Sequence, residues 1–275
     1  MSERLVIVVT GSTRGIGLGL AREIVLRGHH VVVSGRTPEA VAKAVAEVAR
    51  SAAAGARVHG IAADVATHAD LQRLWNESVA HFGRVDIWVN NAGISHPRQR
   101  AGEMRAEDIR NVQQINLLGM MWATQVALRG MRTQPSGGTI YNMEGFGSNG
   151  MMTPGMSLYG ASKFALTYFN RALGSETRDG PVKICYLSPG IVLTDLLKRD
   201  MGVTDPAERA RTRRVYNILA DRVETVTPWL AERIVKPQKS GARVAWLTGG
   251  KAGRRFFLSL FRKRQLLTDA DFADG

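Results

Sequence analysis

The segment 5–17, LVIVVTGSTRGIG, decides the fold that we predict for this 275-residue chain. Its first half is a run of apolar, mostly β-branched residues that is typical of a buried strand, and its glycine-rich second half opens a helix over about 15–28. Gly11 permits a tight turn, whereas Gly15 and Gly17 allow close approach of the backbone to a pyrophosphate and of the helix to the sheet. Free N–H groups at the start of the helix favour an anion there. The segment therefore predicts a dinucleotide-binding strand–turn–helix unit.

The rest of the chain continues the alternation of short apolar runs and longer helical patterns. Further strands are expected at 31–33, 58–63, 85–89, 139–143, 182–187 and 243–247, and helices from Thr37 onward and over about 67–81, 103–133 and 158–177. Strict alternation indicates an α/β fold with a parallel, doubly wound sheet. We predict one domain over 1–250, in which the polar, helical segment 194–240 is a substrate-side insertion closing over one edge of the sheet. A basic extension follows at 251–275.

Composition excludes several classes of protein. A hydrophobic fraction of 44% and a charged fraction of 22% are ordinary for a globular chain and exclude disorder. Cys185 is the only cysteine, so it cannot form an internal disulfide, and no Cys and His residues have zinc-site spacing. The chain has no signal-peptide pattern and no apolar run of the roughly 18 residues that a membrane span needs. We expect a soluble, cytoplasmic protein without a metal.

The charge of +13 is the unusual property of this composition. Residues 195–275 have a net charge of +7, against +6 for the much longer segment 1–194. Such an excess is compatible with nucleic-acid binding, with attraction to an anionic membrane, or with an anionic ligand. Composition leaves these three interpretations open.

The end of the second strand indicates which dinucleotide binds. Dinucleotide sites usually place an acidic residue there to bind the ribose 2′-OH, but this chain reads SGRT at 34–37. Arg36 there and Arg14 in the glycine loop are suited to a 2′-phosphate, which favours NADPH over NADH. The alternative is that Arg36 is a solvated surface charge. Asp64, at the end of the third strand, is placed to accept a hydrogen bond from the adenine amino group.

A tyrosine and a lysine lie one helical turn apart in the helix expected over 158–177. Tyr159 and Lys163 share a face of that helix. A phenol with an ordinary pKa near 10 is a poor acid–base at neutral pH, and a neighbouring cation stabilises the phenolate. Proton transfer of this kind contributes about 10²–10⁴-fold. Alone, this spacing is common in helices and is more typical of an amphipathic surface pair.

The pair is accompanied by other motifs in a characteristic order. These are the glycine loop 10–17, the stretch NNAG at 90–93, Asn116 in an I-N-L context, and Pro189-Gly190 after the sixth strand. With these motifs the chain resembles the short-chain dehydrogenase/reductase family over roughly residues 4–194. The resemblance implies a Rossmann sheet, a nicotinamide cofactor, and hydride transfer at a carbonyl or alcohol carbon. It also implies a homo-oligomer, a dimer or tetramer.

The resemblance implies roles for individual residues. Tyr159 is the expected acid–base, Lys163 lowers its pKa and holds the nicotinamide ribose, and Asn116 fixes a water in the proton relay. The complete set of expected cofactor-binding residues is Gly11, Ser12, Thr13, Arg14, Gly15, Ile16, Gly17, Arg36, Asp64, Val65, Asn91, Ala92, Gly93, Tyr159, Lys163, Pro189, Gly190, Val192 and Thr194.

The chain departs from the family pattern at the residue that polarises the carbonyl. The family usually has a serine about thirteen residues before the tyrosine, where this chain has Phe146, and Glu144-Gly145 stands where two serines are expected. The nearest hydroxyl is Ser148, which neighbouring glycines allow to swing into that role; the alternative is a loop serine without catalytic function. Glu144 is a worse candidate, because a carboxylate would oppose the negative charge that develops on the carbonyl oxygen.

This departure itself resembles one subgroup of the family. The stretch NMEGFGS at 142–148 is similar to the corresponding segment of chlorophyll(ide) b reductases, as are 194–197, 217–220 and 245–251. This resemblance implies NADPH-dependent reduction of the 7-formyl group of chlorophyll(ide) b to hydroxymethyl. One alternative is a family member that acts on another aldehyde, ketone or secondary alcohol. A second is an NADP(H)-binding scaffold or sensor that has lost catalysis, which the missing serine motivates.

The basic tail at 251–264, KAGRRFFLSLFRKR, has six cations, no acidic residue, and large apolar side chains between them. Three interpretations remain open: its aromatic residues pack on the body of the protein, it touches a membrane surface peripherally, or it binds an anionic partner. Nucleic acid is the least expected partner, because no recognition motif accompanies the charge.

Overall fold

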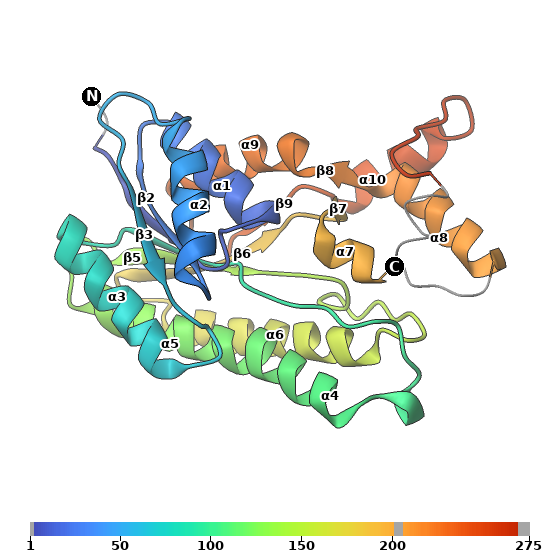
Figure 1. Ribbon diagram of the computed structural model, residues 1–275, viewed down its shortest axis with the longest axis horizontal. Helices are drawn as coiled ribbons and strands as arrows, with labels where there is room; N and C mark the ends of the chain where they lie inside the picture. Colours follow the sequence, from blue (N-terminus) through green and yellow to red (C-terminus); the bar gives the residue numbers. More distant parts are fainter. Residues whose placement is uncertain (1–2, 201–205, 269–275) are drawn as a thin grey trace.

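The computed structural model describes residues 3–200 and 206–268, and its centre is one parallel sheet in the order β3-β2-β1-β4-β5-β6-β9 (Figure 1). The strands are β1 (Val6–Val9), β2 (His30–Gly35), β3 (Val58–Ala62), β4 (Ile87–Asn90), β5 (Gly138–Met143), β6 (Val182–Ser188) and β9 (Arg243–Ala245). Each neighbouring pair is parallel. The predicted doubly wound α/β fold is confirmed.

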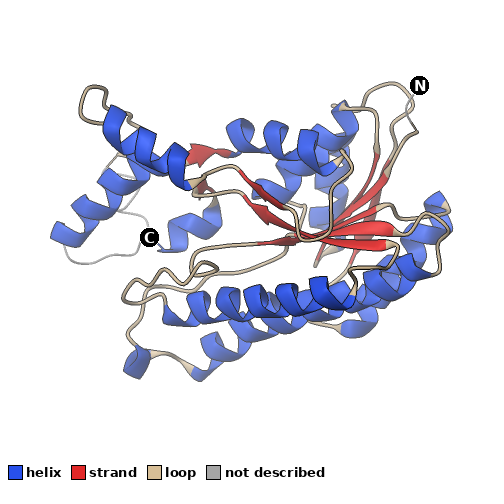
Figure 2. Ribbon diagram, turned by 180° about the vertical axis from the view of Figure 1, so that it is seen from behind, coloured by secondary structure: helices blue, strands red, loops and turns tan. Residues whose placement is uncertain are grey.

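Helices cover both faces of the sheet (Figures 1 and 2). One face carries α1 (Gly15–Leu26), α2 (Pro38–Ala49) and α9 (Val223–Ile234), and the other carries α3 (His68–Phe82), α5 (Gly119–Arg132) and α6 (Ser157–Glu176). A short helix α4 (Ala106–Val112) runs through a π-helical segment (Gln113–Leu118) into α5. Two short strands, β7 (Val192–Leu193) and β8 (Asp221–Arg222), pair separately from the main sheet.

Strand β1 shows why the apolar runs are continuous rather than alternating. Ile7 and Val9 belong to the core cluster under α1, α2 and α9, whereas Val8 between them belongs to the cluster under α3 and α5. Because successive side chains point to opposite faces, a strand covered on both sides must be apolar at every position. The sheet thus has two cores, and its carboxyl edge remains open for a ligand.

The segment predicted as an insertion, 194–240, divides into two parts. Its last part is α9, which packs against α1 and belongs to the regular alternation between β6 and β9. The buried stripe of α9 includes Val226, Leu230 and Ile234, and Pro228 in the middle of the helix hides this pattern in the sequence. The predicted insertion is therefore too long at its C-terminal end.

The first part of that segment lies outside the alternation and pairs with the tail. It contains α7 (Asp195–Asp200) and α8 (Pro206–Leu219), and α10 (Gly249–Leu258) packs on α8. In Figure 1, α8 and α10 project together beyond the carboxyl edge of the sheet, on the right. We call α8, α10 and residues 259–268 the cap.

Candidate active site

A pocket of about 1600 Å³ follows the carboxyl edge of the sheet from the end of β2 to the cap. It lies where the order of the strands reverses. The chain runs from β1 through β2 to β3 on one side of the sheet and then returns to β4 on the other side of β1. Ligands of open α/β sheets bind in the crevice at such a switch point. The pocket is therefore the candidate active site.

The glycine loop, which follows β1, forms one wall of this pocket. Gly11 and Gly15 have φ angles of 62° and 56°, which favour glycine. A Cβ on Gly11 would lie 2.8 Å from Ala92 Cα, so no other residue fits without a backbone shift. Helix α1 begins at Gly15, and the N-cap Arg14 makes no side-chain cap hydrogen bond. The first N–H groups of α1 are thus available to an anion.

The side of the loop away from the pocket is locked by hydrogen bonds. Asn91 Nδ2 donates to the carbonyl oxygens of Thr10 and Gly11 at 2.9 and 3.1 Å. The Ser12 hydroxyl donates to β1 and accepts from the backbone of β2, and a Cβ on Gly17 would meet Asn91 Nδ2 at 2.5 Å. Ser12 and Gly17 therefore shape the loop from behind, while the loop residues that line the pocket are Gly11, Thr13, Arg14, Gly15 and Ile16.

Cations gather at the β2 end of the pocket. Arg36 lines it and is exposed, and Arg14 NH1 lies 4.0 Å from an Asp195 carboxylate oxygen in a solvated pair. Lys43 of α2 lines the same end, and the sequence reasoning missed it. It stands in the interior of a helix, where nothing in the local pattern distinguishes a pocket-lining lysine from a solvated one.

Asp64 and Val65 line the pocket directly after β3, as the sequence predicts for the adenine end. The Asp64 carboxylate accepts from the Ala66 N–H at 2.9 Å, and the Asp64 N–H donates to Asp70 at 2.8 Å. These bonds hold the turn in place. A carboxylate that accepts one bond retains lone pairs for another donor.

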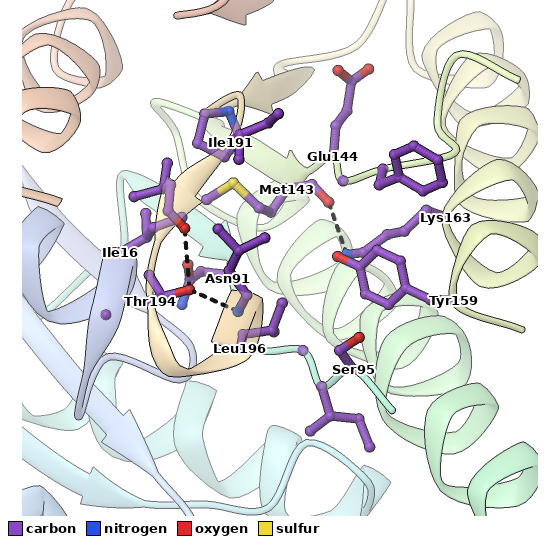
Figure 3. Close-up of a pocket in the computed structure, with 18 of the residues that line it drawn as sticks. Ile16, Asn91, Ser95, Met143, Glu144, Tyr159, Lys163, Ile191, Thr194 and Leu196 are labelled. Atoms are coloured by element: carbon purple, nitrogen blue, oxygen red, sulfur yellow. Dashed lines mark hydrogen bonds between the residues drawn. The ribbon is translucent and has the colours of Figure 1, made fainter. Parts of the chain in front are cut away.

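Tyr159 and Lys163 lie side by side on α6, and both are buried in the pocket wall (Figure 3). Lys163 Nζ donates to the carbonyl oxygen of Met143 at the end of β5, at 3.3 Å, and lies 5.8 Å from the centre of the Tyr159 ring. Burial lowers the pKa of Lys163 to about 8, and the negative charge of Glu144 opposes that shift. A buried cation beside a phenol is the arrangement that stabilises a phenolate.

Glu144 and Gly145 stand where two serines are expected, and a different contact explains each of them. A Cβ on Gly145 would lie 2.5 Å from the Tyr159 hydroxyl, so glycine makes room for the phenol. The Glu144 carboxylate points away from Tyr159 and Lys163 (Figure 3) and accepts from Arg243 of β9 at 2.7–2.8 Å. This ion pair gives the Glu144 carboxylate a countercharge beside the pocket. The sequence could not show it, because 99 residues separate the partners.

Ser148 lines the pocket from the loop after β5. Its hydroxyl accepts from the Gly145 N–H at 3.1 Å, and its carbonyl oxygen accepts from Thr167 of α6 at 2.9 Å. A hydroxyl that accepts one bond still has a proton to donate. Ser95, from the loop after β4, is a second hydroxyl in the pocket wall that the sequence reasoning missed (Figure 3).

Asn116 is fully buried in the π-helical segment, behind the pocket wall. Its Oδ1 accepts from the Ile94 N–H at 2.8 Å, and its Nδ2 donates to the Ile94 carbonyl oxygen at 2.9 Å and to the Ser162 hydroxyl at 3.3 Å. Asn116 therefore holds the chain after β4, where Asn91, Ala92 and Gly93 line the pocket. Its expected contact with a water stays a prediction.

The segment after β6 closes the pocket opposite the glycine loop. Pro189, Gly190, Val192 and Thr194 all line it, as predicted. A Cβ on Gly15 would lie 3.5 Å from Thr194 Cγ2, so the glycine loop and this segment are close neighbours at this point.

Beyond Tyr159 the pocket continues to the cap, and much of its wall there is apolar. The apolar and aromatic side chains are Phe146, Met151, Met156, Leu196, Leu197, Val215, Tyr216, Leu219 and Phe256. They come from segments far apart in the sequence, and only the fold brings them together. No short-range pattern could have identified them.

Within 3–200 and 206–268, no group of His, Cys, Asp and Glu side chains could hold a metal ion. In the same residues, no helix is long and apolar enough to cross a membrane.

Comparison with known proteins agrees with this geometry. A family model for short chain dehydrogenases matches residues 5–201. The chain is 36% identical over 256 residues to Probable chlorophyll(ide) b reductase NYC1, chloroplastic, of Arabidopsis thaliana, a match that covers 88% of this chain and 50% of that protein. It is 35% identical over 259 residues to Chlorophyll(ide) b reductase NOL, chloroplastic, of the same plant, covering 91% and 72%. The chain thus spans only about half the length of the first relative.

Solved structures are similar over nearly their whole length. The KRED1-Pglu enzyme has a TM-score of 0.75 at 28% identity, covering 87% of this chain and 100% of that one. A 3-ketoacyl-(acyl-carrier-protein) reductase from Brucella melitensis, complexed with NADH, has a TM-score of 0.76 at 24% identity, covering 91% and 99%, which supports the fold. With a family match over most of the sheet and relatives that are at least 33% identical, this chain belongs to the short-chain dehydrogenase family.

Proposed function

We propose that the chain is an NADPH-dependent reductase of a formyl group on a large apolar ring, represented by the 7-formyl group of chlorophyll(ide) b. The observation that carries the proposal is the continuity of the cofactor cleft with an apolar cavity beyond Tyr159, in one pocket of about 1600 Å³. Small-molecule pockets usually measure about 300–1000 Å³. The volume suits a ring system beside a dinucleotide, and the names of the relatives agree with that substrate.

The residues of the cleft fit a nicotinamide dinucleotide. The positive φ angles of Gly11 and Gly15 and the open start of α1 form a cradle for the pyrophosphate, and residues 189–194 would border the nicotinamide. Lys163 would hold the nicotinamide ribose. When bound, the reduced dinucleotide supplies the hydride for the carbonyl carbon.

The chain's own part in the reaction is to place and move a proton. The Tyr159 hydroxyl would donate its proton to the carbonyl oxygen, and the Lys163 cation would stabilise the tyrosinate that remains. Ser148 would donate a hydrogen bond to the same oxygen. Asn116 would act through the Ile94 backbone that it holds, and the proton relay water predicted for it would lie on that side.

We propose NADPH rather than NADH, because Arg14, Arg36 and Lys43 line the β2 end and no carboxylate follows β2 directly. Hydrogen bonds to charged groups contribute about 1.5–3 kcal/mol, so Arg36→Asp is expected to lower the NADPH/NADH preference in kcat/KM by about tenfold or more. The matched control is Arg50→Asp, an exposed arginine at the other end of α2. An unchanged preference in Arg36→Asp would contradict the 2′-phosphate assignment.

The substrate is tested directly with purified protein, NADPH and chlorophyllide b. We expect the pigment's absorption spectrum to change as the formyl group becomes hydroxymethyl, and we expect no change with Tyr159→Phe. An unchanged spectrum with the wild-type chain would reject the pigment. Turnover of small aldehydes in the same preparation would then support the alternative of a reductase for another carbonyl.

A scaffold or sensor without catalysis is the second candidate, which the missing serine motivates. The buried Tyr159–Lys163 pair argues against it, because a buried lysine is costly to maintain without a function. A screen of aldehydes and ketones that follows NADPH absorbance separates the two. Any oxidation of NADPH that depends on Tyr159 rejects the scaffold.

We also propose that the chain forms a homo-oligomer. Phe164 and Tyr168 lie one turn apart on α6 and are both exposed, which is unusual for a pair of large side chains on a monomer. Sedimentation velocity measures the state directly. Phe164→Ser with Tyr168→Ser is expected to shift it toward the monomer.

A further inference from the structure

The C-terminal helix α10 and the turn after it present their apolar side chains to solvent. Phe257, Leu260 and Phe261 are 62%, 71% and 73% exposed, and Phe256 and Leu258 are also exposed. We call these five residues the aromatic face. The Phe257 and Phe261 rings are in contact, with centroids 5.5 Å apart. The interpretation in which the tail's aromatic residues pack on the body of the protein is therefore wrong.

The cations of the tail make the contacts with the body instead. Arg255 and Arg264 reach the carboxylate of Asp221, which is 4% exposed, at 2.8 and 2.9 Å. Both also donate to backbone carbonyl oxygens at the end of α8, and Lys251 lies over the Trp246 ring. Charged side chains thus attach α10 and the turn after it, and the aromatic face is left outward. This orientation is the reverse of an ordinary surface helix.

The remaining cations of the tail border the aromatic face. Arg254, Arg262 and Lys263 are exposed, and no acidic residue occurs between 251 and 264. An exposed patch that is apolar in the middle and cationic at its edges is complementary to a lipid surface, where acyl chains lie beneath phosphate groups.

The aromatic face also continues into the active-site pocket. Phe256 belongs to both, and Ala252 and Leu219 line the pocket beside it. A surface that binds the aromatic face would therefore lie at the mouth of the pocket. An apolar molecule could then enter without crossing water.

A second copy of this chain fits the face less well than a lipid surface. Two copies in contact through the aromatic face would bring their Arg254, Arg262 and Lys263 side chains together, and like charges repel at such distances. A bilayer with anionic headgroups meets the same cations with opposite charge.

We propose that the aromatic face docks on the surface of an anionic bilayer. Phe257, Leu260 and Phe261 enter the boundary between headgroups and acyl chains, while Arg254, Arg262 and Lys263 contact the phosphates. The docking itself stands on these surface residues alone, whereas delivery of a substrate through the pocket mouth rests on the proposed function.

The test is co-sedimentation of the full chain with phosphatidylcholine vesicles, with and without phosphatidylglycerol. We expect binding that needs phosphatidylglycerol and weakens with salt. Changing Phe257, Leu260 and Phe261 together to Ser is expected to weaken it by at least about tenfold, because their buried area is lost. Arg262→Gln with Lys263→Gln is expected to weaken it about fivefold for each cation removed.

Matched controls are Leu26→Ser, an exposed leucine at the end of α1, and Arg50→Gln with Arg132→Gln, exposed cations far from the cap in sequence. We expect no effect of either on vesicle binding. Equal binding to vesicles without phosphatidylglycerol, or none to either kind, overturns the proposal. So does an oligomer that the triple Ser variant dissociates in the absence of any vesicle binding, which would identify a second copy as the occupant.

Turnover of a water-soluble aldehyde separates this proposal from the proposed function. The triple Ser variant changes no residue that lines the pocket, so its turnover and melting temperature are expected to match those of the wild-type chain. Failure of vesicle binding with normal turnover overturns only the docking. Absence of turnover with normal vesicle binding contradicts only the reductase.

Discussion

The pocket has a floor, formed by the glycine loop, Gly145 and the Tyr159–Lys163 pair, and it also has the cap. Close packing holds the floor, whereas polar contacts hold much of the cap. At the floor, a Cβ on Gly11 would lie 2.8 Å from the backbone of Ala92, and a Cβ on Gly145 would lie 2.5 Å from the Tyr159 hydroxyl. In the cap, Asp221 receives two guanidinium groups and the indole N–H of Trp246, and the side chains of the aromatic face point outward. Tyr159 and Lys163 thus lie in closely packed surroundings, whereas the cap is attached mainly by polar contacts to Asp221 and to the end of α8, and by the buried side chain of Leu267.

The largest expected effect is at the floor. Tyr159→Phe removes the proton donor and should lower kcat by about 10²–10⁴-fold for every carbonyl accepted, small or large. Fluorescence titration should show nearly unchanged NADPH binding. Tyr186→Phe, which changes a tyrosine of β6 that does not line the pocket, is the control. Full turnover in Tyr159→Phe would mean that the proton comes from elsewhere.

The corresponding change in the cap is Asp221→Asn. It leaves Arg255 and Arg264 without a countercharge, which should loosen the cap by about 1–3 kcal/mol. Hydrogen exchange should speed up in α10 but not in α1, and KM should rise for large substrates only. Glu232→Gln, which breaks an exposed ion pair with Lys236, should change little. Unchanged protection of α10 would show that the cap is held by other contacts.

Gly11→Ala tests whether close packing defines the floor. The variant suffers both a left-handed backbone, at about 1–2 kcal/mol, and a contact with Ala92 that cannot relax without moving the loop. Gly28→Ala suffers only the first, because nothing lies within 4 Å of its Cβ. We expect both to lower the melting temperature and only Gly11→Ala to weaken NADPH binding. Equal NADPH affinity in the two variants would contradict the cradle.

The smallest expected effect is a shift in the pH dependence of kcat when Glu144 is replaced. Lys163 has a pKa of about 8 and is cationic below it, so activity that needs the cation is lost as pH rises through that value. The charge of Glu144 raises this pKa, so Glu144→Gln should move the alkaline limb of the kcat profile to lower pH. Glu176→Gln, at the far end of α6, should leave the profile in place. A limb that moves to higher pH would reject the electrostatic link.

The sequence predictions succeeded best where the interactions concerned join residues that are close together in the chain. The glycine loop, the Tyr159–Lys163 spacing and the strands of the sheet rest on contacts within a few residues, and the fold built from them is confirmed. Helix α9 was wrongly included in the insertion, because Pro228 hides its apolar stripe. Lys43 and Ser95 were missed, because only their position beside distant segments makes them pocket residues.

The parallel sheet, the glycine loop and the one-turn spacing of Tyr159 and Lys163 can be read from the sequence alone, because each depends on local periodicity or on one short motif. Only the tertiary structure decided where the charge of the tail goes. Arg255 and Arg264 turn inward since Asp221, buried in β8, lies within reach once α8 and α10 pack together, and the five apolar residues between them are then left outside. An apolar block flanked by cations is the same in the sequence whichever set faces the body. The position of one buried carboxylate settles it.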